Sequence, residues 1–276
     1  MAPAPLPPPA DPSIGPPAIR ADHLEVGFRD KLVWQDATFE VRPGEFVAVI
    51  GPNGAGKTTL FRMLLGLQRP SGGSLSVLGS SPYRGNGRIG YVPQRHSVDI
   101  DTHIDCESFV RLGVTGTRWG PGLAGRADRQ AAGRALASVG ATELAHKCIG
   151  TLSGGELQRI FLAEAMVGNP EMLLLDEPLS NLDLRRSRDL VTLVYQLVRS
   201  AHVTTLLVAH DINPLIHCLD KVIYIANGRV ATGSPASVLT SASLTALYGV
   251  PVEVLHDSRG NLVIVGGEES VGGEHG

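Results

Sequence analysis

Residues 46–60 read FVAVIGPNGAGKTTL, and this stretch decides the fold. Residues 46–50 are apolar and partly β-branched, which is typical of a parallel strand that is buried on both faces. The following residues match the pattern G-x-x-x-x-G-K-[ST], and Leu and Met then recur at helical spacing as far as Leu67. The stretch therefore predicts a strand, a glycine-rich loop and a helix, in that order.

The glycine-rich loop predicts a phosphate-binding site. Its glycines let backbone N–H groups surround phosphate oxygens, and the start of the helix adds roughly half a positive charge. Lys57 supplies a cation for the outer phosphates, and the Thr58 hydroxyl can ligate Mg²⁺. The residues expected to bind the nucleotide are Gly51, Pro52, Asn53, Gly54, Ala55, Gly56, Lys57, Thr58 and Thr59.

The composition is that of an ordinary soluble protein, with 43% hydrophobic and 18% charged residues in a chain of 276. A formal net charge of −3 gives no basic field for a nucleic-acid backbone, so no nucleic-acid partner is expected. The three cysteines are scattered without metal-ligand spacing, which fits a reducing cytosol. No apolar run approaches the roughly 20 residues of a membrane-spanning helix, so any membrane role is expected to come from a partner.

Pattern changes divide the chain into regions. Residues 1–18 are proline-rich and residues 266–276 are rich in Gly and Glu, and both are expected to be disordered tails. Alternating apolar residues in 19–41 predict strands before the glycine-rich loop. Between residues 97 and 152 the strand signals vanish and apolar residues recur at helical intervals, which predicts a helical insertion.

A second buried strand, MLLLDEP in residues 172–178, ends in two carboxylates. Ligands gather at the carboxyl ends of parallel strands, so Asp176 is expected beside the phosphate loop, holding Mg²⁺ directly or through water. Glu177 is then placed to orient and deprotonate an attacking water. The alternative interpretation is an acidic turn that ends the strand.

The segment LSGGELQ, residues 152–158, lies just upstream of this strand. Ser153 resembles a helix N-cap, and the two glycines after it leave N–H groups open to an anion. Together with the phosphate loop and MLLLDEP, the segment resembles the LSGGQ signature of the ATP-binding cassette (ABC) transporter family, with Glu156 in place of the final glutamine. The resemblance covers roughly residues 19–254.

This resemblance implies an α/β fold, namely a P-loop NTPase of the ABC type with an antiparallel β-subdomain and a helical subdomain. The ATPase domain is expected to span residues 19–265 and its helical subdomain about 97–168. The implied activity is ATP hydrolysis coupled to transmembrane solute transport, with ATP and Mg²⁺ as cofactors.

Four further residues match functional positions of the family. Gln94 matches the loop glutamine that senses Mg²⁺ and the water, and His210 matches the switch histidine that contacts the γ-phosphate. Asp183 matches a loop that crosses to the other subunit, although a simple helix N-cap explains it equally well. Phe28 aligns with the aromatic residue that stacks on adenine, and packing in the core is its alternative.

The resemblance also implies partners. In this family the signature of one subunit closes on the ATP held by the phosphate loop of another, and this chain has one copy of each element. We therefore expect a dimer that encloses a pair of MgATP, with Ser153, Gly154, Gly155 and Glu156 contacting the partner's nucleotide. Membrane permease subunits, a location at the cytoplasmic face of the membrane and an extracytoplasmic solute-binding protein are implied as well.

Two segments bear on the substrate. Residues 89–96, IGYVPQRH, and residues 247–252, LYGVPV, resemble the ATPases of manganese, zinc and chelated-iron importers. Thr102 and His103 depart from that group, which often has an aromatic residue and a proline there. A haem- or siderophore-type importer is therefore the nearest alternative, and a multidrug-type exporter is the next.

The sequence fits functions outside transport less well. A soluble ABC ATPase that acts on DNA would carry long heptad insertions, and the insertion here is short and lacks them. A ribosome-associated type would carry two cassettes, and a non-ABC phosphate-loop kinase would lack LSGGE and His210. The nearby residues His96, Asp99, Asp101 and His103 are either a metal site or a solvated loop.

Overall fold

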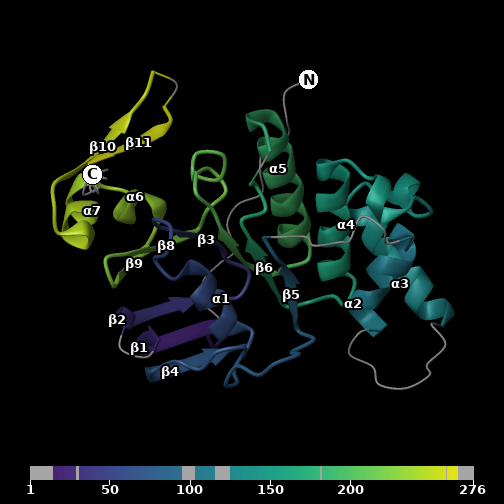
Figure 1. Ribbon diagram of the computed structural model, residues 1–276, viewed down its shortest axis with the longest axis horizontal. Helices are drawn as coiled ribbons and strands as arrows, with labels where there is room; N and C mark the ends of the chain where they lie inside the picture. The colour runs from purple at the N-terminus through teal and green to yellow at the C-terminus, as the bar shows by residue number, and fades with distance from the viewer. Residues whose placement is uncertain are drawn as a thin grey trace, which may run out of the picture.

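The computed structural model describes residues 15–28, 31–94, 103–115, 125–180, 182–258 and 260–266. Its centre is a six-stranded sheet with the order β5-β6-β7-β3-β8-β9 (Figure 1). All neighbouring strands run parallel except β8 and β9. The strands are β3 (Phe46–Ile50), β5 (Ile89–Val92), β6 (Met172–Asp176), β7 (Thr204–Val208), β8 (Lys221–Ala226) and β9 (Arg229–Gly233).

Strands β3, β6 and β7 are buried along their whole length, as their apolar runs predict. Successive side chains of a strand point to opposite faces of the sheet. Leu173 and Leu175 of β6 accordingly pack into the cluster formed with the helical region. Met172 and Leu174 pack into the cluster on the other face, which contains α1 (Lys57–Leu64). The two-sided burial leaves only the strand ends accessible.

A three-stranded antiparallel sheet lies on the α1 side, with the order β2-β1-β4. It consists of β1 (Ile19–Phe28), β2 (Lys31–Val41) and β4 (Gly72–Val77). The predicted extension of α1 to Leu67 is wrong. The helix ends at Leu64, Gly66 adopts a φ of 67°, and the Leu67 side chain beyond it is 53% exposed.

The helical region contains α2 (Cys106–Thr115), α3 (Arg126–Ser138), the 3₁₀ turns η1 (Thr142–Leu144) and η2 (Ile149–Thr151), and α4 (Gly154–Met166). It lies beside the six-stranded sheet in Figure 1. Phe109 of α2 and Phe161 of α4 meet edge to face with centroids 5.1 Å apart. The α/β class with an antiparallel sheet and a helical region is confirmed.

The rest of the chain forms α5 (Leu184–Ser200), α6 (Pro235–Val238), α7 (Ser241–Tyr248), and a hairpin of β10 (Val252–His256) and β11 (Leu262–Gly266). In Figure 1 the hairpin lies near α7, on the side of the molecule away from the helical region. The predicted tails fall mostly on residues 1–14 and 267–276, which lie outside the described residues.

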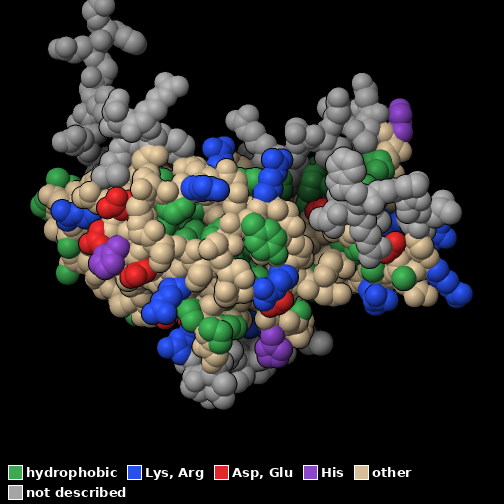
Figure 2. Space-filling view, turned by 90° about the horizontal axis from the view of Figure 1, so that it is seen from below, with side chains coloured by type: hydrophobic (Ala, Val, Ile, Leu, Met, Phe, Trp, Pro, Cys, Tyr) green, Lys and Arg blue, Asp and Glu red, His purple; other side chains and the backbone are tan. Residues whose placement is uncertain are grey.

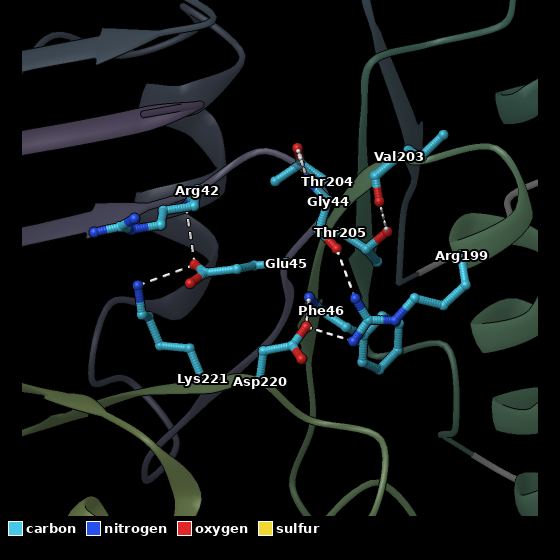
Figure 3. A network of polar contacts seen from close by, with 10 residues as sticks. All are labelled: Arg42, Gly44, Glu45, Phe46, Arg199, Val203, Thr204, Thr205, Asp220 and Lys221. Atoms are coloured by element: carbon cyan, nitrogen blue, oxygen red, sulfur yellow. Dashed lines mark hydrogen bonds and ion pairs between the residues drawn. The ribbon is translucent and has the colours of Figure 1, made fainter. Parts of the chain in front are cut away.

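A polar network joins the amino ends of three central strands (Figure 3). The Arg199 guanidinium at the end of α5 donates to the Gly44 carbonyl at 3.0 Å and to the Asp220 carboxylate at 2.6 Å. Asp220 also accepts the backbone N–H of Phe46 at 2.7 Å. The network therefore fixes the edge of the sheet opposite to the one that carries Asp176.

Acidic, basic and apolar side chains are interspersed on the face seen from below, so the described residues form no single-sign field there (Figure 2). Within the described part of the chain, no helix has the length and hydrophobicity needed to span a membrane.

Candidate functional site

The loop between β3 and α1 can be built only with glycine at two positions. Gly51 has a φ of 143°, and a Cβ there would lie 1.9 Å from the carbonyl oxygen of Ile225 in β8. Gly56 has a φ of 100°, and its Cβ would lie 2.6 Å from the indole nitrogen of Trp34 in β2. Left-handed backbone and close contact together exclude other residues. The loop therefore presses against both sheets, and its curved backbone precedes the helix start.

Lys57, the first residue of α1, turns its side chain back over the loop. Its ammonium donates to the carbonyl oxygens of Gly51 at 2.7 Å and Pro52 at 2.9 Å. Burial lowers the pKa of Lys57, while the negative charges of Glu177 and Asp176 oppose this change. The predicted cation of the phosphate site is thus held between the loop and the two carboxylates.

Asp176 ends the buried strand β6, and its side chain is almost inaccessible. Oδ2 accepts a long hydrogen bond of 3.5 Å from the Tyr91 hydroxyl, and Oδ1 has no hydrogen-bond partner among the described residues. Burial, followed by the charge of Glu177, raises the pKa of Asp176. A buried carboxylate oxygen without a partner beside a phosphate loop fits the coordination of Mg²⁺, which prefers carboxylate oxygens.

Glu177 lies between two side chains from neighbouring strands. Gln94, after β5, donates from Nε2 to its Oε2, and Nε2 of His210, after β7, lies 2.8 Å from its Oε1. The strand order β5-β6-β7 explains the meeting, because all three residues follow carboxyl ends at the same edge of the sheet. The structure therefore brings together the three residues predicted for catalysis.

The Glu177 backbone adopts a φ of 51°, an uncommon conformation for a residue other than glycine. Such strain persists only where the surrounding structure enforces it, and it concentrates at functional sites. A cavity of about 300 Å³ opens beside Glu177, His210 and Ser180. The cavity has room for water beside Glu177.

The signature segment begins helix α4. Ser153 is the N-cap, and Glu156 reaches back to accept its backbone N–H at 2.9 Å and its hydroxyl at 2.7 Å. These bonds and Lys147, whose Nζ lies 3.3 Å away, lower the pKa of Glu156 to about 2. Glu156, which stands where the family signature has glutamine, thus completes a capping box with Ser153. Glutamate and glutamine can both fill this position.

Gly154 and Gly155 open this helix in empty surroundings. A Cβ at either position would meet no atom within 4 Å, and neither residue has a positive φ. Nothing within the described chain therefore requires glycine there. The start of α4 is therefore open to the approach of another molecule at both glycines.

One positioning residue was missed from the sequence. Gln158 of α4 donates from Nε2 to the Pro178 carbonyl at 2.7 Å, one residue beyond Glu177. The bond connects the signature helix directly to the segment that carries the predicted base. A glutamine on a helix gives no sequence signal for such a contact, because the partner is a backbone atom 20 residues away.

The remaining predicted residues are less informative. Asp183 caps α5 by accepting the Arg186 N–H at 2.8 Å, so the N-cap interpretation holds, while its role across a dimer stays a prediction. The Phe28 side chain, His96, Asp99 and Asp101 lie outside the described residues. His103 is exposed, and no group of three or more potential metal-ligating side chains occurs among the residues that are described.

Comparisons with known proteins show similarity over most of the chain. The family model described as "ABC transporter" matches residues 34–180. The manganese transport system ATP-binding protein MntB of Bacillus subtilis is 35% identical over 242 residues, which cover 87% of this chain and 95% of that protein. The zinc import ATP-binding protein ZnuC of Pseudomonas entomophila is 34% identical over 267 residues, covering 93% and 96% of the two chains.

Solved structures show the same similarity. A chain of an ABC transporter assigned to the metal-chelate type, in an inward-facing conformation, superposes with a TM-score of 0.78 at 28% identity. The match covers 91% of this chain and 98% of that one. The ATP-binding cassette MJ1267 superposes with a TM-score of 0.73 at 19% identity, which supports the fold alone.

Proposed function

Because the chain belongs to the ABC transporter family, we propose that it is the ATP-hydrolysing subunit of an importer for a transition metal, with manganese and zinc as the first candidates. ATP binding and hydrolysis follow from the family. The metal assignment is supported by relatives named for manganese transport and zinc import.

The placement of Glu177 between Gln94 and His210, at the strand edge next to the phosphate loop, is the observation that carries the proposal. In this scheme the loop N–H groups and Lys57 hold the phosphates. Glu177 takes the proton of the attacking water, and Gln94 and His210 keep its carboxylate in position. Preorganised groups of this kind each contribute about 10²–10³ in rate.

Thr58, Gln94 and Asp176 are the residues proposed to hold Mg²⁺. When bound, the ion neutralises charge on the phosphate oxygens. The buried Oδ1 of Asp176, which has no partner among the described residues, supports this assignment. Phe28, at the end of β1, is proposed to stack on adenine.

The open surroundings of Gly154 and Gly155 support a dimer in which this segment reaches the nucleotide of a second copy. Membrane permease subunits and an extracytoplasmic solute-binding protein are proposed as further partners. The chain would then work at the cytoplasmic face of the membrane, as a peripheral subunit.

The test is reconstitution of the chain with its permease in liposomes, followed by measurement of ATP hydrolysis. Stimulation by a manganese- or zinc-loaded binding protein is expected, with the Glu177→Gln variant as the inactive control. Stimulation by a haem or siderophore complex, or by a drug, and not by the metal-loaded protein would overturn the metal assignment. No ATP hydrolysis under any condition would overturn the enzyme itself.

A further inference from the structure

Asn213 connects the segment that follows His210 to the hairpin of β10 and β11. Its Oδ1 accepts the backbone N–H of Leu262 at 2.7 Å, and its Nδ2 donates to the carbonyl oxygen of the same residue at 3.0 Å. Nδ2 also donates to the Asp211 carboxylate at 2.9 Å. The oxygen and both N–H donors of the amide are therefore in use. One half-buried side chain thus joins strand β11 to the residue directly after His210.

The backbone after His210 is ordered by two further contacts. Oδ1 of Asp211 accepts the backbone N–H of Asn213 at 2.9 Å, which forms an Asx turn. Ile212 is buried in the cluster that contains Val252 of β10, and Leu262 of β11 packs against the same cluster. His210 and Asp211 line the cavity of about 300 Å³ beside Glu177, so this segment borders open space. The contacts with the hairpin therefore help to hold the segment in place.

The hairpin itself is anchored at two points. An isolated two-stranded hairpin is marginally stable in water, so it depends on the surfaces to which it is attached. The Thr245 hydroxyl of α7 accepts the backbone N–H of Val252 at 3.0 Å and donates to its carbonyl at 3.2 Å. Val252 and Leu262 lie at opposite ends of the ladder. The hairpin thus extends from α7 to the segment after His210, with Thr245 at one end and Asn213 at the other.

We propose that Asn213 is a positioning residue for His210, through which the hairpin supports the histidine in its contact with Glu177. This inference rests on the proposed function, in which His210 keeps the Glu177 carboxylate in position. Nε2 of His210 lies 2.8 Å from Oε1 of Glu177, and a hydrogen bond weakens steeply when its geometry is disturbed. A displacement of about 1 Å in a catalytic group can cost about a hundredfold in rate.

The alternative is that Asn213 only keeps the hairpin folded. Thr245 provides a matched comparison, because its side chain also holds the N–H and the carbonyl of one hairpin residue. It does so from α7, whereas Asn213 does so from the segment after His210. A purely stabilising role predicts similar effects on hydrolysis when either anchor is removed. A positioning role predicts that only the loss of Asn213 slows hydrolysis.

The first test compares Asn213→Ala with Thr245→Val in steady-state ATP hydrolysis by the chain reconstituted with its permease. Asn213→Ala should lower kcat about tenfold and leave KM and the affinity for a fluorescent ATP analogue unchanged, because the phosphate loop is not altered. Thr245→Val keeps the shape of the side chain but removes its two bonds, and it should leave kcat unchanged. Native turnover in Asn213→Ala, or an equal loss in both variants, overturns the inference.

A second test asks whether Asn213 acts through His210. In a His210→Ala background, Asn213→Ala should cause no further loss of rate, because residues that act as a unit are not additive. Single-turnover hydrolysis resolves the slow rates of these variants. A further tenfold loss in the double variant overturns the inference. Failure of the proposed function gives a different result, namely no hydrolysis by the native chain or a native rate in His210→Ala alone.

Discussion

Nε2 of His210 lies 2.8 Å from Oε1 of Glu177, so these two residues from neighbouring strand ends are in direct contact. Gln94 donates a hydrogen bond from Nε2 to the other carboxylate oxygen, Oε2. The two neighbours therefore hold the Glu177 carboxylate in position from both sides.

Glu177→Gln should retain ATP binding and lose about 10²–10⁴ in turnover, because glutamine keeps the shape of the side chain but cannot accept the proton. Measurement of phosphate release tests the loss of turnover, and the affinity for a fluorescent ATP analogue tests the retained binding. Hydrolysis at the wild-type rate would exclude Glu177 as the base.

Lys57→Ala should weaken ATP binding and nearly abolish turnover, because it removes the cation held over the phosphate loop. Nucleotide titration and steady-state hydrolysis measure the effects. Arg20→Ala removes a cation from an exposed ion pair on β1 and serves as the control with little change. Equal behaviour of the two variants would contradict the assignment.

Two glycine substitutions should fail for different reasons. Gly51→Ala would place a methyl group 1.9 Å from the Ile225 carbonyl, so both folding stability and ATP binding should be lost. Gly154→Ala meets no atom within 4 Å, so the monomer should fold and bind ATP normally but dimerise poorly. Thermal unfolding, ATP affinity and sedimentation separate the outcomes. Normal dimer formation by Gly154→Ala would show that this segment does not approach the partner's nucleotide.

The carboxyl group of Glu164 should make stability depend on pH. It lines a cavity with Tyr91 and Gly113, and burial raises its pKa from 4.5 to about 7. The folded state then holds the proton more tightly than the unfolded state, so the free energy of unfolding should fall as the pH rises from about 4.5 to 7. At about 1.4 kcal/mol per pKa unit, this loss reaches about 3 kcal/mol.

Glu164→Gln removes this titration. Urea unfolding at pH 5 and pH 8 should therefore show a smaller difference for the variant than for the native chain, with the variant more stable at pH 8. Parallel stability curves for the two proteins would contradict the assignment. The neighbouring Glu171, which is exposed and paired with Arg88, is a suitable site for a Gln control.

Asp220→Ala should lower the free energy of unfolding by about 3 kcal/mol, because Arg199 would remain buried without its counter-charge. The two side chains are only 18% and 10% exposed, and Asp220 also accepts the Phe46 N–H. Glu40→Ala breaks the exposed pair with Arg20 and should cost less than about 1 kcal/mol. Chemical denaturation of both variants tests the contrast.

The central strands were predictable because two-sided burial leaves unbroken apolar runs such as MLLLD in β6. The bounds of α2 within the predicted helical insertion were not, since Gly113 lies in this helix and glycine opposes helix formation. The structure explains this glycine, because a Cβ would lie 2.4 Å from the Glu164 carbonyl of α4. Tertiary contact thus decided what local propensity could not.

Among the site residues too, some features were predictable from the sequence and others were not. The motifs indicated that Gln94, Glu177 and His210 are functional residues, and the strand order β5-β6-β7 of the structure explains why they meet. The contact of Gln158 with the Pro178 carbonyl and the attachment of Leu262 by Asn213 depend on backbone atoms of distant segments. Backbone partners leave no pattern in the sequence, and such contacts become visible only in three dimensions.

The bonds from Lys57 to the carbonyls of Gly51 and Pro52 have a consequence for nucleotide capture. The loop is preorganised by its own side chain, so an incoming triphosphate does not bear the conformational entropy of ordering it. Binding instead exchanges one set of acceptors for another around a single ammonium group. Affinity should therefore respond mainly to the charge of the ligand, with triphosphate favoured over diphosphate and monophosphate.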